Sequence, residues 1–246
     1  MVGSHSRRTA IRNFSDVDYF AVFSREDVRW GGSLVRSSTV LNRLRDELAS
    51  RYWQTGVSRD AQAIVVDFAG GARPVDVVPA FFKEFGVGWP IYEIPDGQGG
   101  WMRASPEAHT KYLKNEDERS GGKLKRVVQM LKYWRECRTP RVPLKSFHLE
   151  IVLAVEGVCV GVKPYSECLI DAFHILQKRE CRAIQDPMGI SGLVPSTATD
   201  SQRIGAITSL RSALSHALSA WDAERNGKID EAKRQWNIVF NSGFPY

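Results

Sequence analysis

The sequence is poor in the features that mark secreted, zinc-binding and membrane-spanning proteins. Its 246 residues include four cysteines, which lie far apart and form no Cys-x-x-Cys pair. That spacing argues against a zinc site, and a disulfide framework is not expected in a chain of this size. No apolar run approaches the roughly 18 residues that a membrane span needs, and no signal peptide opens the chain. We therefore expect a cytoplasmic protein that does not enter a membrane.

Internal repeats, low-complexity segments and a strong net charge are missing as well. The apolar fraction of 43% and the charged fraction of 25% are those of a globular protein. The net charge of +6 is small, but it is unevenly spread. Residues 123–145 hold eight Lys or Arg and one acid, Glu136. Such a block indicates either a partner that carries phosphate or a solvated helix face.

The character of the chain changes near residue 105. Before it, short apolar runs bounded by Gly and Pro predict strands, and one segment with helical spacing predicts a helix at 34–53. The expected strands are 19–23, 63–69 and 74–80, the last two joined as a hairpin through Gly70-Gly71. After it, Ser105-Pro106-Glu107 predicts a helix start. Further helices are expected near 122–138, 146–157, 164–181, 200–226 and 228–240. We predict an α+β protein with a sheet lobe (1–104) packed against a helical lobe (105–246) and a cleft between them.

Two aspartates, Asp16 and Asp18, stand with one residue between them next to the first predicted strand. Side chains alternate between the faces of a strand, so both carboxylates point the same way. Two carboxylates that close repel each other, which raises the pKa of each unless a cation compensates. Mg²⁺ suits this role because it prefers oxygen ligands and shares its remaining positions with substrate phosphates. An Asp-x-Asp pair alone is a weak signal, since surface turns contain it often.

A third carboxylate, Asp76, lies inside the apolar strand "RPVDVVPAF", where a bare charge is costly to bury. The alternative is that Asp76 faces solvent on an edge strand, which the flanking prolines permit. Composition does not choose between Asp76 and Asp67, since both belong to the same predicted hairpin. Alternation favours Asp76, because Val75 and Val77 are expected on the packed face and Asp76 on the opposite one.

The pair Gly3-Ser4 precedes these acids and supplies what they lack. Glycine lets the backbone approach a phosphate closely, and the serine hydroxyl can hydrogen-bond to it. A Gly-Ser pair, an Asp-x-Asp on a strand and a third Asp on a later strand match the pattern of the polymerase-β-like nucleotidyltransferases. In that pattern three acids hold two metal ions, which activate the attacking hydroxyl and stabilise the leaving pyrophosphate.

Longer stretches resemble one branch of that superfamily, the bacterial CD-NTases (SMODS-type second-messenger synthases), which are relatives of oligoadenylate synthases and cyclic GMP-AMP synthase. In the first half the resemblance lies in "GSHSRRTAIRNFSDVD" and "VDVVPAF". In the second half it lies in "LKRVVQMLKYWR", "LKSFHLE", "IQDPMG" and "EAKRQWNIVFNSGFP", in the family's order. The chain departs from the pattern at its start: the family carries a helical stretch before the Gly-Ser pair, and here two residues precede it.

The resemblance implies a polymerase-β-like fold and a role for each matching residue. Gly3 and Ser4 would bind the donor triphosphate. Asp16, Asp18 and Asp76 would be the catalytic residues and hold two Mg²⁺ ions, for which Mn²⁺ can substitute.

Three residues of the helical half complete the implied site. Lys132 and Ser146 would bind donor phosphates, and Phe147 would stack on a nucleobase. Each has a structural alternative: a surface lysine for Lys132, a helix cap for Ser146 and an ordinary core residue for Phe147.

Three functions fit these patterns. The resemblance favours a template-independent nucleotidyltransferase that joins ATP or other NTPs into a cyclic or linear oligonucleotide messenger, which activates an effector protein in bacterial antiphage (CBASS-type) defence. The second is an RNA-extending enzyme of the CCA-adding type, although helices like those of the messenger synthases leave no room for a tRNA-binding domain. The third is an inactive relative that only holds nucleotide. The presence of the three carboxylates and Ser4 argues against this function. Binding of RNA or DNA stays open.

Overall fold

The structure is a computed structural model, which describes the chain except residues 13, 69–71, 87 and 244–246. The chain divides into two compact units, Met1–Tyr112 and Leu113–Tyr246. The division falls inside helix α3 (Pro106–Arg119), at whose start the sequence places the domain boundary. Among the described residues, no helix is both long enough and apolar enough to cross a membrane.

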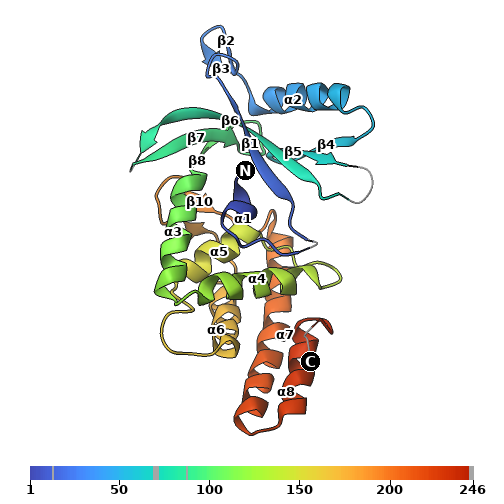
Figure 1. The fold of residues 1–246 in the computed structure, drawn as a ribbon, viewed down its shortest axis with the longest axis vertical. Coiled ribbons are helices and arrows are strands. Elements are labelled where there is room, and N and C mark those ends of the chain that lie inside the picture. Colours follow the sequence, from blue (N-terminus) through green and yellow to red (C-terminus); the bar gives the residue numbers. More distant parts are fainter. Residues whose placement is uncertain (13, 69–71, 87, 244–246) are drawn as a thin grey trace. The chain divides into compact units, whose positions relative to one another are not determined.

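The first unit is built on a six-stranded sheet (Figure 1). Its strands are β1 (Val17–Phe23), β4 (Gly56–Asp60), β5 (Ala63–Asp67), β6 (Val75–Gly86), β7 (Trp89–Pro95) and β8 (Trp101–Ala104). The order is β4-β5-β6-β7-β8, and β1 pairs with β6 as the parallel member. The unit also contains α1 (Gly3–Ser6), the short strands β2 (Arg29–Trp30) and β3 (Ser33–Leu34), and α2 (Ser37–Arg51).

Helix α2 covers one face of this sheet because its apolar residues recur at helical spacing. Leu41 and Leu44 are buried against Ile64 of β5, and Val77 of β6 packs on the same cluster. Farther along the sheet, Val40 of α2 and Phe81 of β6 join a second buried cluster. The face of β6 that carries Val77 is therefore the packed one, and alternate residues of β6 lie on the opposite face.

In the second unit, the regular structure of the described residues is helical apart from one short two-stranded pair. Its helices after α3 are α4 (Lys123–Glu136), α5 (Ser146–Val155), α6 (Tyr165–Lys178), α7 (Asp200–Arg225) and α8 (Ile229–Val239), and the pair is β9 (Ile184–Gln185) with β10 (Leu193–Val194). Trp134 of α4 is fully buried and meets Phe173 of α6 edge to face, with ring centroids 5.1 Å apart. Thr199 caps α7 by accepting a hydrogen bond from the Gln202 backbone N–H.

The structure contains the predicted strands, together with β4, β7 and β8 of the same sheet, which were not predicted. The strands expected at 19–23, 63–69 and 74–80 are β1, β5 and β6, and β5 pairs with β6 in the antiparallel sense of a hairpin. The predicted turn Gly70-Gly71 lies outside the described residues. Ser105 is the predicted cap of α3, accepting from the Ala108 backbone N–H at 3.4 Å.

Candidate active site

The two acid-bearing strands lie side by side in the sheet. Strand β1 runs parallel to β6, and the register places Asp18 directly opposite Asp76. Side chains at paired positions share a face, so both carboxylates lie on the face opposite to Val77 and helix α2. Asp16 lies just before β1, and its charge acts on both Asp18 and Asp76. The register therefore pairs two of the three acids that the sequence singles out, and the third lies near them.

The competing acid, Asp67, stands at the end of β5. It pairs with Gly56 of β4 and is exposed. Val65, rather than Asp67, is the residue of β5 that lies opposite Asp76. Val77, which was predicted on the packed face of the sheet, is partly buried against the cluster that α2 forms with β5. The strand register therefore agrees with Asp76 as the third acid of the group.

The three carboxylates repel one another, as the raised pKa values of Asp18 and Asp76 indicate. Burial, together with the negative charges of Asp16, Asp18 and Asp60, raises the pKa of Asp76 to about 6. Burial also raises the pKa of Asp18, with Asp16 adding to the effect. The guanidinium of Arg7 acts in the opposite direction on Asp18. Such a cluster on a half-buried strand is stabilised when a cation arrives.

The first residues of the chain are hydrogen-bonded to Asp18. The Val2 backbone N–H donates to the Asp18 carbonyl at 2.8 Å, and the Ser4 backbone N–H donates to the Asp18 carboxylate. Gly3, at φ +67°, passes so close that a Cβ atom there would lie 1.9 Å from Oδ2 of Asp18. Gly3 and Ser4 are therefore in direct contact with Asp18 of the Asp-x-Asp pair.

This donor set fits a magnesium ion. Carboxylate oxygens are the ligands that Mg²⁺ prefers, and Mg²⁺ usually takes only one or two of them and completes its shell with water and substrate phosphates. Among the described residues, no three Asp, Glu, His or Cys side chains are placed to hold a metal ion together, so an ion here would take one or two of these carboxylates and complete its shell with water and substrate. The mutual repulsion at Asp76 is the feature that a divalent cation relieves.

Lys132 is buried in the helical unit. Its side chain is 2% exposed and forms an ion pair with Glu150 of α5, which is fully buried. The alternative of a surface lysine is therefore wrong. The neighbouring basic residue Arg135 is also buried, donating to the Leu144 carbonyl at 2.6 Å. A phosphate at Lys132 has to compete with Glu150 for the ammonium group.

Ser146 and Phe147 open helix α5. Ser146 is its first residue, the cap position belongs to Lys145, and no side chain caps this helix end. The alternative of a capping serine is therefore wrong as well. Phe147 is half-buried, whereas the three residues after it are buried. It is thus less enclosed than an ordinary core residue of this helix.

Two acids of these surroundings were missed by the sequence analysis. Asp60 ends β4 and contributes to the raised pKa of Asp76. Glu150 pairs with Lys132 across two helices. A signal for Glu150 was present, since an acid inside the apolar run "FHLEIVLAV" requires a buried partner. Asp60 carries no such signal, because it stands in a polar segment.

Comparison with known proteins points to one family. Residues 1–117 match the family model of the Second Messenger Oligonucleotide or Dinucleotide Synthetase (SMODS) domain. A probable cyclic nucleotide synthase from Bacillus cereus is 24% identical over 270 residues, which cover 99% of this chain and 81% of that protein.

Solved structures share the fold. CdnC of Escherichia coli, determined with ATP, superposes with a TM-score of 0.75 at 22% identity, covering 100% of this chain and 83% of CdnC. The DncV cyclic AMP-GMP synthase of Vibrio cholerae, determined with a linear intermediate, gives a TM-score of 0.72 at 13% identity, covering 100% of this chain and 69% of DncV. The predicted family resemblance and the α+β nucleotidyltransferase fold are confirmed.

Proposed function

We propose, because residues 1–117 match the model of the Second Messenger Oligonucleotide or Dinucleotide Synthetase family, that the protein is a nucleotidyltransferase that joins nucleoside triphosphates into a cyclic oligonucleotide. The Bacillus cereus relative is a probable cyclic nucleotide synthase. Among the structures with the same fold, CdnC was determined with ATP and DncV is a cyclic AMP-GMP synthase. We take ATP as one substrate of this chain.

One observation carries the proposal: Asp18 and Asp76 are paired across parallel strands, and the charges of Asp16 and Asp18 both raise the pKa of Asp76. A module that only holds nucleotide has no need of three carboxylates that repel one another. Perturbed carboxyl groups of this kind cluster at sites that perform chemistry. Phosphoryl transfer with metal ions is the chemistry that uses them together.

Asp16, Asp18 and Asp76 would hold two Mg²⁺ ions, or Mn²⁺ in their place. When bound, these ions activate the attacking hydroxyl and stabilise the leaving pyrophosphate. Gly3 and Ser4 would bind the donor triphosphate through the backbone and the serine hydroxyl, next to Asp18, which their segment already contacts.

The helical unit would complete donor binding through three residues. Lys132 and Ser146 would bind phosphate oxygens, with Lys132 shared between Glu150 and the nucleotide. Phe147, which is half-buried at the start of α5, would stack on the nucleobase. Base stacking on an aromatic side chain contributes about 1–3 kcal/mol. These roles follow from the family resemblance of the segments "LKRVVQMLKYWR" and "LKSFHLE".

We place the product in bacterial antiphage (CBASS-type) signalling, where an oligonucleotide messenger activates an effector protein. The support is the description of the family as second-messenger synthetases.

The test is metal-dependent pyrophosphate release from each NTP. We expect release with Mg²⁺ or Mn²⁺, none with EDTA, and none from a double variant carrying Asp16→Asn and Asp18→Asn. Asp46→Asn is the matched control, because Asp46 is an exposed acid on α2 that pairs with Arg45. Undiminished release by the double variant would refute the proposal, and so would extension of added RNA as the sole reaction.

A further inference from the structure

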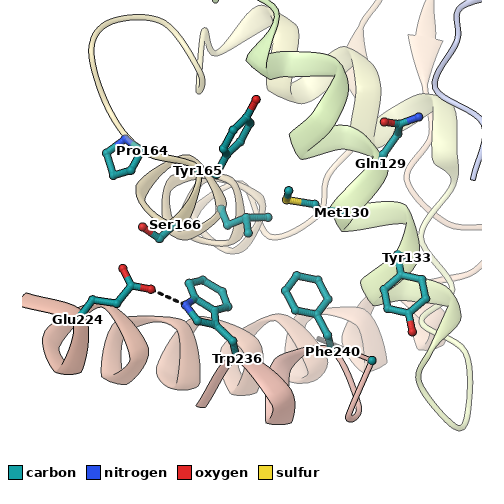
Figure 2. A pocket seen from close by; sticks show the side chains of 11 residues that line it. Gln129, Met130, Tyr133, Pro164, Tyr165, Ser166, Glu224, Trp236 and Phe240 are labelled. Atoms are coloured by element: carbon teal, nitrogen blue, oxygen red, sulfur yellow. Dashed lines mark hydrogen bonds between the residues drawn. The ribbon is translucent and has the colours of Figure 1, made fainter. Parts of the chain in front are cut away.

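The helical unit contains a cavity of about 600 Å³ that the proposed reaction does not use. It lies between α4, the start of α6, and α8, as Figure 2 shows. Trp236 of α8 and Phe240, the residue that follows this helix, form one wall and project toward Met130 and Tyr133 of α4. Cavities of roughly 300–1,000 Å³ with apolar walls and a few polar groups are typical of small-molecule sites.

Aromatic rings dominate the walls. The rings of Trp236 and Phe240 are stacked at an interplanar angle of 26°, with centroids 6.1 Å apart. Tyr133 lies 6.2 Å from Phe240 and extends the same surface. Tyr165, at the start of α6, lines the cavity from the opposite side and is exposed. Walls of this kind accept a planar ring or attract a cation over their faces.

The charge of the cavity is negative. Among the described residues that line it, the only formally charged one is Glu224, whose Oε1 accepts from Trp236 Nε1 at 2.8 Å. A carboxylate has further acceptor positions besides this one. Glu224 also lies in the last turn of α7, where the helix dipole adds negative potential. The nearby Arg225 is placed over the ring of Trp221, at 4.7 Å from its centroid.

One feature of the cavity, the N-terminus of helix α6, contributes positive potential. Pro164, Tyr165 and Ser166 mark the start of α6, whose free backbone N–H groups favour an anion. That helix carries an acid in its own first turn, Glu167, which offsets this end of the dipole. The balance of formal charge at the cavity therefore remains negative, and a nucleoside triphosphate is unsuited to it.

From these contacts we propose that the cavity binds an aromatic amine cation. The ring of the ligand packs among Trp236, Phe240 and Tyr133, and its ammonium group donates to the carboxylate of Glu224. The ligand is thus chemically distinct from the anionic NTP substrates, and the proposal does not depend on catalysis.

The test compares two probes with the same ring and opposite charge, 1-naphthylmethylamine and 1-naphthylacetate. Binding to the full chain is measured by calorimetry and by ligand-observed NMR, with no NTP present. We expect saturable binding of the amine at one site, at least tenfold tighter than binding of the acetate. Glu224→Gln keeps an oxygen for Trp236 Nε1 but removes the charge, so the tenfold preference should disappear. Asp222→Asn, an acid on the same helix outside the cavity lining, should leave it unchanged.

A second variant tests the location. Ser166→Trp places a bulky side chain in the cavity from a half-buried position near the start of α6, and it should weaken binding of the amine at least tenfold with an unchanged melting temperature. The proposal is overturned if neither probe binds, if the acetate binds as tightly as the amine, or if Ser166→Trp leaves binding intact. Because no nucleotide is present, these results stand apart from success or failure of the pyrophosphate assay.

Discussion

Gly3 lies against the carboxylate of Asp18, so close that a Cβ atom on residue 3 would come within 1.9 Å of Oδ2. The backbone of Gly3 is left-handed, with φ +67°, and the next residue donates its N–H to the same carboxylate. Two features therefore require glycine at this position: its left-handed backbone conformation, and the space that Asp18, a predicted metal ligand, occupies beside it.

Gly3→Ala is expected to abolish pyrophosphate release. The added methyl group forces the Asp18 carboxylate out of its position, and a left-handed alanine costs about 1–2 kcal/mol. Gly31→Ala is the matched control: Gly31 has φ +57°, but a Cβ atom added to it would have nothing within 4 Å. Activity and melting temperature of both variants are measured together. Equal activity in the two variants would show that contact with Asp18 is irrelevant.

Asp76→Asn is expected to lower the rate of pyrophosphate release by more than about a hundredfold, because changes in groups that merely support a metal ligand already cost about 10–100-fold. Asp67→Asn should keep most of the activity, since Asp67 is exposed and pairs with Gly56 at the end of β5. Rates at saturating ATP and Mg²⁺ decide between the two. The opposite ranking would assign the third catalytic carboxylate to Asp67.

The stability of the protein should depend on pH through Asp76. Its pKa rises from 3.8 to about 6 on folding. The charged form is thus disfavoured in the folded state, and stability is lost as the pH rises through this window. In EDTA, Asp76→Asn should raise the free energy of unfolding at pH 8 by roughly 1–2 kcal/mol, which is less than the full shift implies because the side chain is partly solvated. The gain should vanish below pH 4.

Denaturant unfolding of both proteins between about pH 3 and pH 8 measures this difference. A difference that stays constant with pH would mean that Asp76 titrates alike in the folded and unfolded chain. A variant less stable than the parent at pH 8 would mean that the Asp76 charge is already compensated.

The structural role of Lys132 and its proposed role in nucleotide binding can be tested separately. Lys132→Met leaves Glu150 buried without its ion-pair partner, and breaking a buried pair in this way costs about 3–5 kcal/mol. Adding Glu150→Leu removes the stranded charge and should restore most of the stability. ATP binding, measured by calorimetry, should remain at least about tenfold weaker in the double variant, because a positive charge next to the phosphates is gone. A double variant that binds ATP as the parent does would make Lys132 purely structural.

Much of this fold could be predicted because its elements carry local signals. Helix α4 is marked by its apolar stripe, and α3 by its cap Ser105. Strands β7 and β8 were not predicted: β7 begins and ends near Pro90 and Pro95, which interrupt the strand pattern, and β8 is only four residues long.

The sequence was enough to identify the acidic residues of the candidate site. It was not enough to predict which residues contact one another there. Alternation along β6 was enough to place Asp76 opposite Val77, because that rule depends on neighbouring residues alone. Asp18 and Asp76, which are paired across two parallel strands, are 58 residues apart in the sequence. Lys132 and Glu150 form an ion pair between two different helices. Such contacts are decided by packing over long separations, which a local pattern does not encode.

The central claim is that the chain makes a cyclic oligonucleotide, and mass spectrometry of its products tests this most directly. The full chain is incubated with isotopically labelled NTPs and Mg²⁺, singly and in pairs, and the products are treated with phosphatase. We predict a phosphatase-resistant product whose mass equals a whole number of nucleoside monophosphates less one water for each linkage, ring closure included. Asp16→Asn with Asp18→Asn should yield none. Products that all lose terminal phosphate, or labelled nucleotides found only on added RNA, would contradict the account.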